Sequence, residues 1–485
     1  MIIQTPKMAS GLYLIAAILC TVFTVGELTG ILRKQFLPGP ILYEGDADPG
    51  KPLFLTPYIK KKDYRKARDL SEVKGIHSSL HYSSHAGFFT VNETTNSNMY
   101  FWFFPAKNGD KNAPLLLWLQ GGPGDSSLFA LFNENGPIMI DKNGNVQPRP
   151  VNWNEDYSIM YIDNPIGAGF SFTDSDEGYS SNEDQIADNL YECLQQFFLV
   201  FDDYQKNDFY ITGESYAGKF IPALAYKIHQ SNPTAQLKIN MKGVAIGDGF
   251  CDPINMVVGY ADLMQQFSLI DSVQAEYVRK QMEAVAAETN AGNYVQAFQI
   301  FAEVISGDLL PYPSYFVNVT GCTNLWNILE TSISVEFGYY GAFLEKAEVR
   351  NKIHVGNLTY SDGLTTEKIL IGDVMQSVAP QLATVMENYK VLLYNGQLDV
   401  AVGGPLTERF LLVLQWSGAD AFAQADRNVW KIKPDDVEVA GFVRKSNNFT
   451  QVIVRGAGHF LPYDQPERGL DMLDRFIGYK SNWEF

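Results

Sequence analysis

Cysteine and histidine are scarce in this 485-residue chain, which has four of the first and six of the second. They show no zinc-binding spacing, and the sequence contains no His-Glu-x-x-His pair and no glycine-rich phosphate loop. We therefore expect neither a metal nor a cofactor. Basic residues are also in deficit, with 37 Lys and Arg against 55 Asp and Glu, a net charge of -18. Such a balance argues against binding to nucleic acid or to anionic membranes.

Long apolar runs are absent except at the amino terminus. There Lys7 precedes an uncharged apolar stretch over residues 12–25, and small residues up to Gly26 resemble a cleavage region. We interpret residues 1–26 as a secretory signal peptide, with a retained signal anchor as the alternative. No membrane association is expected after its removal. Four Asn-x-Thr sequons agree with export and predict glycosylation at Asn92, Asn318, Asn357 and Asn448.

The cysteines leave little room for a disulfide framework. Cys20 should depart with the signal peptide, and Cys193 lies in a helix-like run typical of a buried structural thiol. By elimination, Cys251 and Cys322 are the expected disulfide pair.

Short apolar runs that end in Gly-rich turns indicate buried strands of a mostly parallel sheet. Helical patterns over 184–200 and 217–230 alternate with them, the rhythm of a doubly wound α/β domain with helices on both faces. The expected strands are 114–119, 158–162, 208–211, 243–246, 390–394 and 451–454.

The rhythm breaks over 251–355, where amphipathic helical patterns predominate. We interpret this stretch as a helical lid inserted into one core, formed by 75–250 and 356–485, although a second, unrelated domain is the alternative. Residues 27–74 form an amino-terminal segment that is a candidate propeptide.

Residues 209–218 combine a strand, a tight turn and the start of a helix, with Ser215 at the apex. This is the pattern of a nucleophile elbow, in which Gly213 and Ala217 leave the strained turn the space it needs. The last position of the general G-x-S-x-G motif is Ala217 rather than Gly, so the motif alone is a weak signal.

Chain order identifies the partners of Ser215. In a fold of this type the acid follows the serine and the histidine follows the acid. Asp399 and His459 each come directly after an apolar run and fit that order, whereas Asp373 is a weaker candidate for the acid. The three residues predict a catalytic triad, in which His459 acts as general base and Asp399 orients its ring.

A glycine-rich turn follows the strand at 114–119 and would let the backbone approach a substrate closely. The N–H groups of Gly122 and Tyr216 are the expected oxyanion hole, because the second belongs to the residue after the nucleophile.

Long and specific motifs surround the candidate triad, namely 118–124, 152–155, 163–171 and 458–466. In these motifs, from about residue 118 to its end, the chain resembles the serine carboxypeptidase family, and within it the vitellogenic-like members. It implies an α/β-hydrolase fold, removal of single residues from peptide carboxyl termini, and activity at acidic pH. A secreted, lysosomal or yolk-granule location would suit such an enzyme.

By the same resemblance, Gln120, Gly121, Glu134 and Glu214 bind the terminal carboxylate of the substrate. A glutamate pair can bind an anion if the two side chains share a proton and donate through it. Three positions depart from the family pattern: Gln120 replaces the usual Asn, Asp125 a disulfide cysteine and Phe460 a Met. These changes affect the reach of the clamp and leave the triad intact.

The main hypothesis is therefore a serine carboxypeptidase that acts on peptide carboxyl termini. An acyltransferase or esterase would use the same triad, and a non-catalytic binding or protective protein could keep the fold. The two glutamates argue against the first alternative, and the intact triad argues against the second. The sequence leaves a homodimer open.

Overall fold

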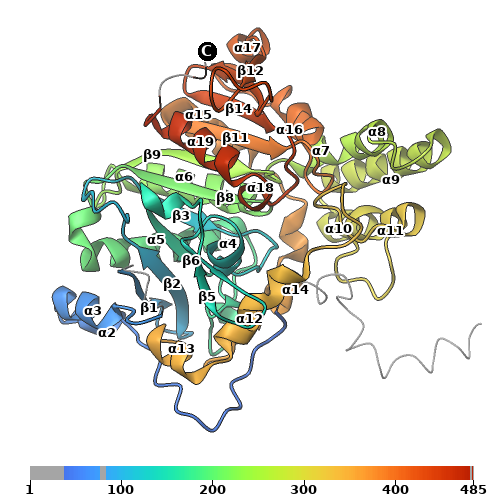
Figure 1. The fold of residues 1–485 in the computed structure, drawn as a ribbon. Helices are drawn as coiled ribbons and strands as arrows, with labels where there is room; N and C mark the ends of the chain where they lie inside the picture. The colour runs from blue at the N-terminus through green and yellow to red at the C-terminus, as the bar shows by residue number, and fades with distance from the viewer. Residues whose placement is uncertain (1–37, 77–82, 481–482, 484–485) are drawn as a thin grey trace, which may run out of the picture.

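A ten-stranded sheet forms the centre of the molecule, which we describe from a computed structural model covering residues 38–76, 83–480 and 483 (Figure 1). The expected signal peptide lies outside these residues. The six inner strands run parallel in the order β6, β3, β8, β9, β11 and β14, and antiparallel strands extend both edges. The strands of this sheet, in spatial order, are β1 His85–Asn92, β2 Ser97–Phe104, β6 Ser158–Ile162, β3 Leu115–Leu119, β8 Phe209–Glu214, β9 Met241–Gly247, β11 Lys390–Gly396, β14 Phe449–Val454, β13 Gly441–Ser446 and β12 Asn428–Trp430.

All six strands expected from apolar runs are present and form the parallel centre. The helices expected at 184–200 and 217–230 are also confirmed, as α5 and α6. The sequence analysis missed the antiparallel edge strands. Two small ribbons lie outside the main sheet, one from β4 Ile138–Ile140 and β5 Val146–Pro148, the other from β7 Ala168–Gly169 and β10 Ser361–Asp362.

Helices cover both faces of the sheet because its central strands are apolar on both sides. In β3, Leu115, Leu117 and Leu119 face one hydrophobic cluster, and Leu116 and Trp118 face a second. Helices on the first face include α2 Thr56–Lys60, α3 Tyr64–Ser71, α5 Glu183–Val200, α6 Ala217–Ser231, α14 Leu364–Val374, α15 Ala379–Asn388 and α16 Gly404–Leu411. On the second face lie α4 Leu128–Asn133, α12 Tyr339–Leu344, α13 Ala347–Lys352, α18 Leu461–Asp464 and α19 Pro466–Ile477.

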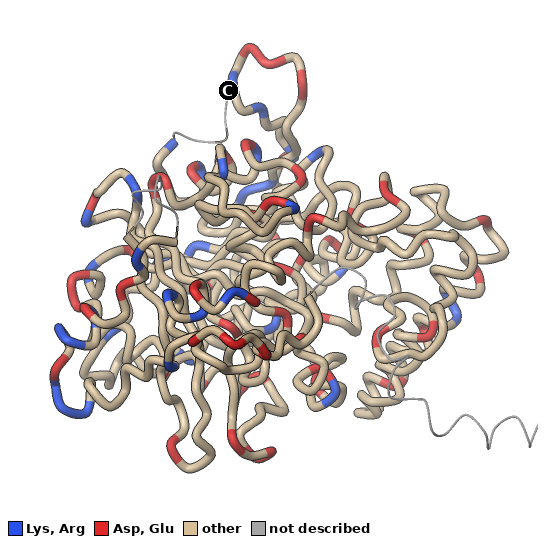
Figure 2. The backbone as a smooth tube through the Cα atoms, turned by 60° about the horizontal axis from the view of Figure 1, so that its bottom comes forward, with Lys and Arg blue, Asp and Glu red and all other residues tan. Residues whose placement is uncertain are grey.

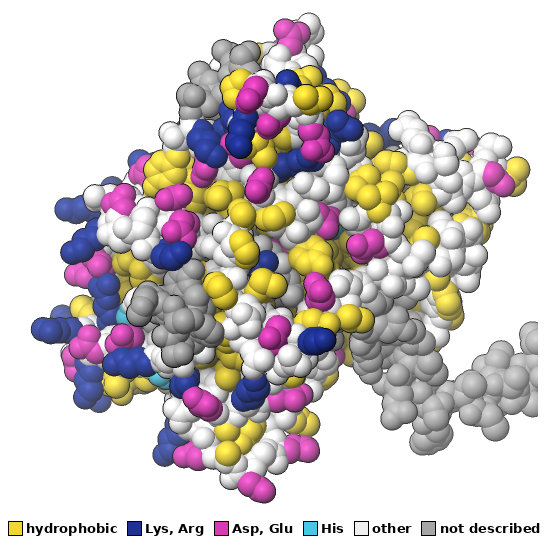
Figure 3. All heavy atoms as spheres, viewed as in Figure 1, with side chains coloured by type: hydrophobic (Ala, Val, Ile, Leu, Met, Phe, Trp, Pro, Cys, Tyr) yellow, Lys and Arg dark blue, Asp and Glu magenta, His cyan; other side chains and the backbone are white. Residues whose placement is uncertain are grey.

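Residues 251–355 contribute no strand to the main sheet. Several of their helices project from one side of the body (Figure 1), and hydrophobic side chains gather near the junction in the view of Figure 3. The helices not yet given are α7 Pro253–Met256, α8 Tyr260–Gln266, α9 Ser272–Asn290, α10 Tyr294–Phe301 and α11 Tyr315–Thr320 in this stretch, and α17 Ala419–Ala423 later in the chain.

The amino-terminal segment packs onto the core where the structure describes it. Leu55 N donates to Phe88 O, and Phe88 N donates to Leu53 O, so the segment continues the pairing beyond β1. Leu55 is fully buried, and the guanidinium of the buried Arg350 donates to Ile41 O. Residues 41–55 therefore contribute backbone hydrogen bonds and apolar packing to the folded domain.

The expected disulfide between Cys251 and Cys322 is wrong, because both cysteines are free, as is Cys193. Cys251 is fully buried in the apolar core, which raises its pKa. Cys322 is half-buried and lies two residues beyond the end of α11, where its thiol donates to Thr320 O at 3.8 Å. Elimination along the sequence selected the pair without any information on where the two thiols lie.

Among the described residues, no single helix is long and apolar enough to cross a membrane. Only the pair α14 and α15, bent by 88° at the break between them, passes that test of length and composition. Charged residues of both signs are spread over the surface rather than gathered on one basic face (Figure 2).

Candidate active site

Ser215 occupies a strained turn between β8 and α6. Its φ of 62° lies in the left-handed region, which non-glycine residues rarely adopt. The turn is fixed by its own backbone, since Ser215 N donates to Gly247 O at 2.9 Å and Ser215 O accepts from Gly218 N and Phe250 N. A Cβ at Gly218 would lie 2.6 Å from Phe250 N, so only glycine fits there. This is the nucleophile elbow that the sequence predicts.

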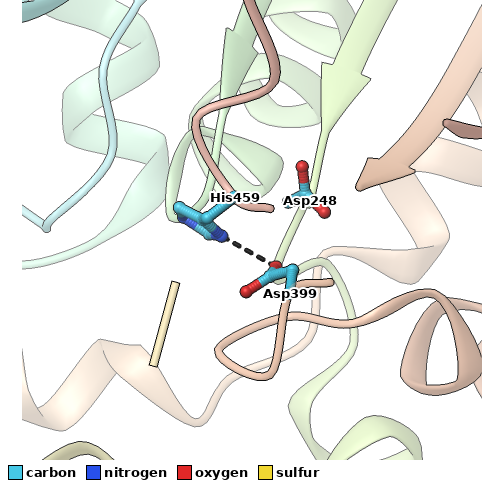
Figure 4. Close-up of side chains that lie close together, drawn as sticks. All are labelled: Asp248, Asp399 and His459. Atoms are coloured by element: carbon cyan, nitrogen blue, oxygen red, sulfur yellow. Dashed lines mark hydrogen bonds and ion pairs between the residues drawn. The ribbon is translucent and has the colours of Figure 1, made fainter. Parts of the chain in front are cut away.

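Asp399 and His459 meet at the carboxyl ends of β11 and β14, as the chain order predicts. His459 Nδ1 lies 2.8 Å from Asp399 Oδ2, and both side chains are buried (Figure 4). Ala401 N and Val402 N each donate to Asp399, which fixes the carboxylate. Burial acts to lower the pKa of His459, but the charge and hydrogen bond of Asp399 outweigh it and raise that pKa.

The second nitrogen of His459 is available for catalysis. His459 Nε2 is buried and has no hydrogen-bond partner among the described residues. Ser215 and His459 line the same pocket. With Nδ1 held by Asp399, Nε2 is the atom that can accept a proton from Ser215.

A short segment of the 251–355 stretch connects the loops that carry the acid and the base. We call residues 325–328 the strap. Trp326 O accepts from His459 N at 2.7 Å, and Leu325 O accepts from Val400 N and Ala401 N. The strap therefore holds the backbone on both sides of the Asp399–His459 hydrogen bond.

A carboxylate connects the strap to the histidine loop once more. Asp464 Oδ2 accepts from Gly458 N at 2.6 Å and from Asn327 Nδ2 at 3.1 Å. A Cβ at Gly458 would lie 2.2 Å from Trp326 O, so the glycine beside His459 is required by the close approach of the strap.

Replacing Asn327 by Leu should lower kcat about 10-fold and change KM little, because a loosened histidine loop misplaces the base. The measurement is steady-state hydrolysis of a blocked dipeptide. Leu329→Ala, at a position 73% exposed in the same turn, is the matched control. Unchanged kcat in Asn327→Leu would show that the strap is not needed to place His459.

The expected oxyanion hole is assembled by contact between two loops. Neither Gly122 N nor Tyr216 N has an acceptor in the part of the chain that the structure describes. Gly121 lies against the elbow, where a Cβ would be 2.6 Å from Ser215 Cβ and 2.7 Å from Tyr216 N. Tyr216 also caps the N-terminus of α6, so the helix dipole adds positive potential. Two free N–H groups beside Ser215 suit a developing oxyanion.

Asp373, the weaker candidate for the triad acid, lies elsewhere. It pairs with the fully buried Lys219 at 2.5 Å and accepts a hydrogen bond from the Tyr216 hydroxyl at 3.1 Å. Glu183 is buried beside this pair, and burial and the Asp373 charge raise the pKa of Glu183 against the opposing effect of Lys219. Asp373 thus anchors the side chain of Tyr216, the residue whose backbone N–H is predicted to belong to the oxyanion hole.

The expected carboxylate clamp forms one buried group next to the elbow. Gln120 Nε2 donates to Glu214 Oε1 at 2.8 Å, while Trp118 Nε1 donates to Gln120 Oε1. Glu134 and Glu214 are fully buried and lie close enough to interact electrostatically, and among the described residues neither Glu134 oxygen nor Glu214 Oε2 has a hydrogen-bond donor. Burial raises the pKa of both, and the Glu134 charge raises that of Glu214 further. A shared proton is the arrangement that such a pair requires.

The pocket around Ser215 has two aromatic walls. Phe129 and Phe337 contact Phe460, with ring centroids 5.0 and 5.2 Å apart, and α4, which carries Phe129, ends at the clamp residue Glu134. On the other side, Phe250 and Tyr260 both contact Phe301. Other lining residues are Gln120, Gly121, Gly122, Tyr216, Phe298, Ile305, Val317, Trp326 and His459.

The structure therefore brings together the residues predicted for the triad, the oxyanion hole and the clamp. Sequence reasoning missed the strap, the Lys219–Asp373 pair and Asp248, which lies beside Asp399. A signal for the last was present, since Asp248 stands between two glycines at the end of the apolar run 243–246.

A serine nucleophile at an elbow, followed in chain order by an acid and a histidine on a doubly wound sheet, defines an α/β-hydrolase. The family model described as serine carboxypeptidase matches residues 75–479, and the chain belongs to that family.

Relatives and a solved structure agree with this family assignment. The chain is 48% identical to the probable serine carboxypeptidase CPVL of Homo sapiens over 95% of this chain and 96% of that protein. It is 43% identical to the venom serine carboxypeptidase of Apis mellifera, over 91% of this chain and 94% of that protein. It is 38% identical to the vitellogenic carboxypeptidase of Aedes aegypti, over 96% of this chain and 98% of that protein. The fold matches that of KEX1, a prohormone-processing carboxypeptidase of Saccharomyces cerevisiae, with a TM-score of 0.71 at 20% identity over 85% and 96% of the two chains. The chain is thus a serine carboxypeptidase that acts on peptides with free carboxyl termini.

Proposed function

We propose that the chain releases one carboxyl-terminal residue at a time through an acyl-enzyme on Ser215. His459 Nε2 accepts the Ser215 proton as Oγ attacks the scissile carbonyl, and the N–H groups of Gly122 and Tyr216 bind the oxyanion. His459 then returns the proton to the leaving amine. Water, activated by the same nitrogen, releases the shortened peptide. The observation that carries this assignment is that His459, whose ring is oriented by its hydrogen bond with Asp399, lines one pocket with Ser215.

Restriction to the terminal bond is assigned to Gln120, Gly121, Glu134 and Glu214. A glutamate pair that holds one proton donates a hydrogen bond to the substrate carboxylate. Once that proton is lost, the pair repels the carboxylate. Burial raises the pKa of Glu134 to about 8, so the protonated form that binds substrate prevails at acidic pH. Substrate binding is therefore strongest below neutrality and weakens as pH rises.

The helices of 251–355 act as a lid in this proposal. Phe298, Ile305 and Val317 from this stretch line the catalytic pocket, and the strap contacts both triad loops. A second, unrelated domain would have no reason to contribute to both.

A secreted or lysosome-type location completes the proposal. The four sequon asparagines, Asn92, Asn318, Asn357 and Asn448, are all exposed and accessible to glycosylation. The names of the venom and vitellogenic relatives agree with a secretory route. The candidate propeptide at 27–74, the signal peptide and the homodimer remain predictions.

The test compares a blocked dipeptide with its carboxyl-amidated twin from pH 4 to 8. We expect release of the terminal residue from the free acid alone, with KM rising as pH increases. Equal cleavage of both substrates would overturn the clamp and favour an esterase or amidase. Release of acyl products to added amines or alcohols in place of water would favour an acyltransferase. No cleavage at any pH would favour a binding protein.

A further inference from the structure

Asp248 lies directly behind the catalytic acid, at the carboxyl end of β9. It is fully buried, and its φ of 42° places it in the left-handed region. Its backbone N donates to Tyr394 O at 2.7 Å, which ties the turn to β11, the strand that precedes Asp399. A strained, buried carboxyl at this point requires a reason, because burial of an uncompensated charge is costly.

The two oxygens of Asp248 differ in their surroundings. Oδ1 accepts from Gly396 N at 3.0 Å and from Asn395 Nδ2 at 3.3 Å. Oδ2 is buried and has no donor among the described residues. A buried acceptor without a donor is explained if that oxygen carries a proton and donates it.

The acceptor for that proton is next to it. One ligand atom each of Asp248, Asp399 and His459 lies within 4.8 Å of the others, and Figure 4 shows the Asp248 and Asp399 side chains side by side. Asp399 already accepts from His459, Ala401 and Val402, three donors that favour its ionised form. Of the two acids, Asp248 is therefore the one that stays neutral.

Among the residues that the structure describes, His459 is the only basic side chain paired with either acid. None of the ion pairs within the described ranges brings a lysine or arginine to Asp248 or Asp399. The remaining titratable groups around Asp248 are Glu214 on β8 and the buried Tyr394 hydroxyl on β11, and neither supplies a cation. Burial and the Asp399 charge raise the pKa of Asp248 well above its ordinary value.

We propose that Asp248 is a positioning residue that stays protonated and donates a hydrogen bond from Oδ2 to Asp399. The bond fixes the Asp399 carboxylate and disperses part of its charge. Without that donor, Asp399 would stabilise the imidazolium more strongly, so the free-base form of His459 would appear only at higher pH. If Asp248 were itself ionised, its charge would act on His459 in the same direction. The neutral carboxyl thus keeps His459 available as a base at the acidic pH of the proposed function, on which this inference rests.

Two substitutions of Asp248 distinguish the effect of its hydrogen-bond donor from the effect of its charge. Asp248→Asn keeps a side-chain donor, cannot ionise, and tolerates the left-handed backbone. Asp248→Gly tolerates the same backbone and removes the donor. Both are measured on a blocked amino-acid ester, which has no terminal carboxylate, so the Glu134–Glu214 clamp does not enter the pH profile.

We expect Asp248→Asn to keep kcat within about threefold of the parent. In a plot of kcat against pH, the acidic limb, where kcat rises as His459 loses its proton, should stay at the same pH as in the parent. Asp248→Gly should lose about 10-fold in kcat, with that limb shifted upward by roughly half a pH unit. The downfield proton resonance of His459 Nδ1–H should persist in Asp248→Asn and move in Asp248→Gly. Labelling of Ser215 by a fluorophosphonate checks that each variant folds.

Parental kcat and an unmoved limb in Asp248→Gly would overturn the proposal. So would a limb that shifts equally in both variants, because Asp248 would then act through its charge. Failure of the parent itself to cleave any ester or peptide would contradict the carboxypeptidase assignment instead.

Discussion

Ser215→Ala is expected to lower kcat by about 10⁶-fold on a blocked dipeptide, a loss of the size known for other Ser-His-Asp enzymes. The strained elbow holds Ser215 in the pocket that it shares with His459, so the substitution removes the hydroxyl that this base would activate. His459→Ala should cost about as much, and the double variant no more, because the two side chains act as one unit. Asp399→Asn should cost about 10⁴-fold, through loss of the correct histidine tautomer.

The measurement is kcat by stopped or continuous release of the terminal amino acid, with thermal midpoints recorded for each variant. Ser181→Ala, at an exposed serine, is the control and should retain full activity. Additive losses in the Ser215–His459 double variant would show that the two residues do not operate together. A Ser215→Ala enzyme that retained more than a thousandth of its kcat would require a different nucleophile.

The second large effect is expected on stability, which should fall as pH rises from about 5.5 to 7. Several buried carboxyls hold protons in the folded state that the unfolded chain releases near pH 4. Burial raises the pKa of Asp163 to about 7 and that of Asp464 to about 6. Glu183 and the pairs Glu134–Glu214 and Asp248–Asp399 add one proton each.

The sign follows from linkage. Because the folded-state pKa values are raised, this stability is fully present below the unfolded pKa and is lost as pH rises through the folded values. Two histidines reduce this proton excess of the folded state below pH 6.5. Burial lowers the pKa of His85 to about 4 and also lowers that of His354, so the unfolded chain binds these protons more readily. The folded state therefore holds a net excess of about three protons. Each proton is equivalent to about 1.36 kcal/mol per pH unit, or about 1.3 °C of Tm in a chain of this length, so Tm should fall by about 4 °C per pH unit.

Scanning calorimetry from pH 4.5 to 8 tests this, with Glu183→Gln as the diagnostic variant. The Glu183 oxygens have no donor within the described residues, so Gln can replace the neutral acid as a donor toward Asp373. We expect the variant and the parent to have similar Tm at pH 5. The fall of Tm with pH should be smaller in the variant, by the amount that corresponds to about one bound proton. A Tm that rises toward pH 7, or an unchanged slope in Glu183→Gln, would show that these carboxyls are ionised in the folded protein.

Several features were accessible from the sequence because they are local. Continuous apolar runs predict strands such as 114–119 and 390–394, since a parallel strand is buried on both faces. Small residues next to Ser215 predict the tight turn of a nucleophile elbow, because larger neighbours would not fit. Asp399 and His459 followed from the rule that sites lie at the carboxyl ends of parallel strands, combined with chain order.

Contacts between distant segments could not be predicted in this way. The strap lies more than 70 residues from Asp399 in sequence and binds the residues beside Asp399 through backbone atoms, which leave no pattern of residue types. The Cys251–Cys322 pairing failed for the same reason, because the count of cysteines says nothing about how far apart their thiols lie.

The sequence by itself therefore determined the class of fold and the family, since local patterning and long motifs carry that information, and it predicted the residues of the triad. Only the tertiary structure decided which groups surround the triad. The strap, the Lys219–Asp373 pair and the Asp248–Asp399 pair all arise where loops from different strands meet. Protonation of the buried carboxyls was decided there too, because burial and neighbouring charge depend on the folded arrangement and not on residue type.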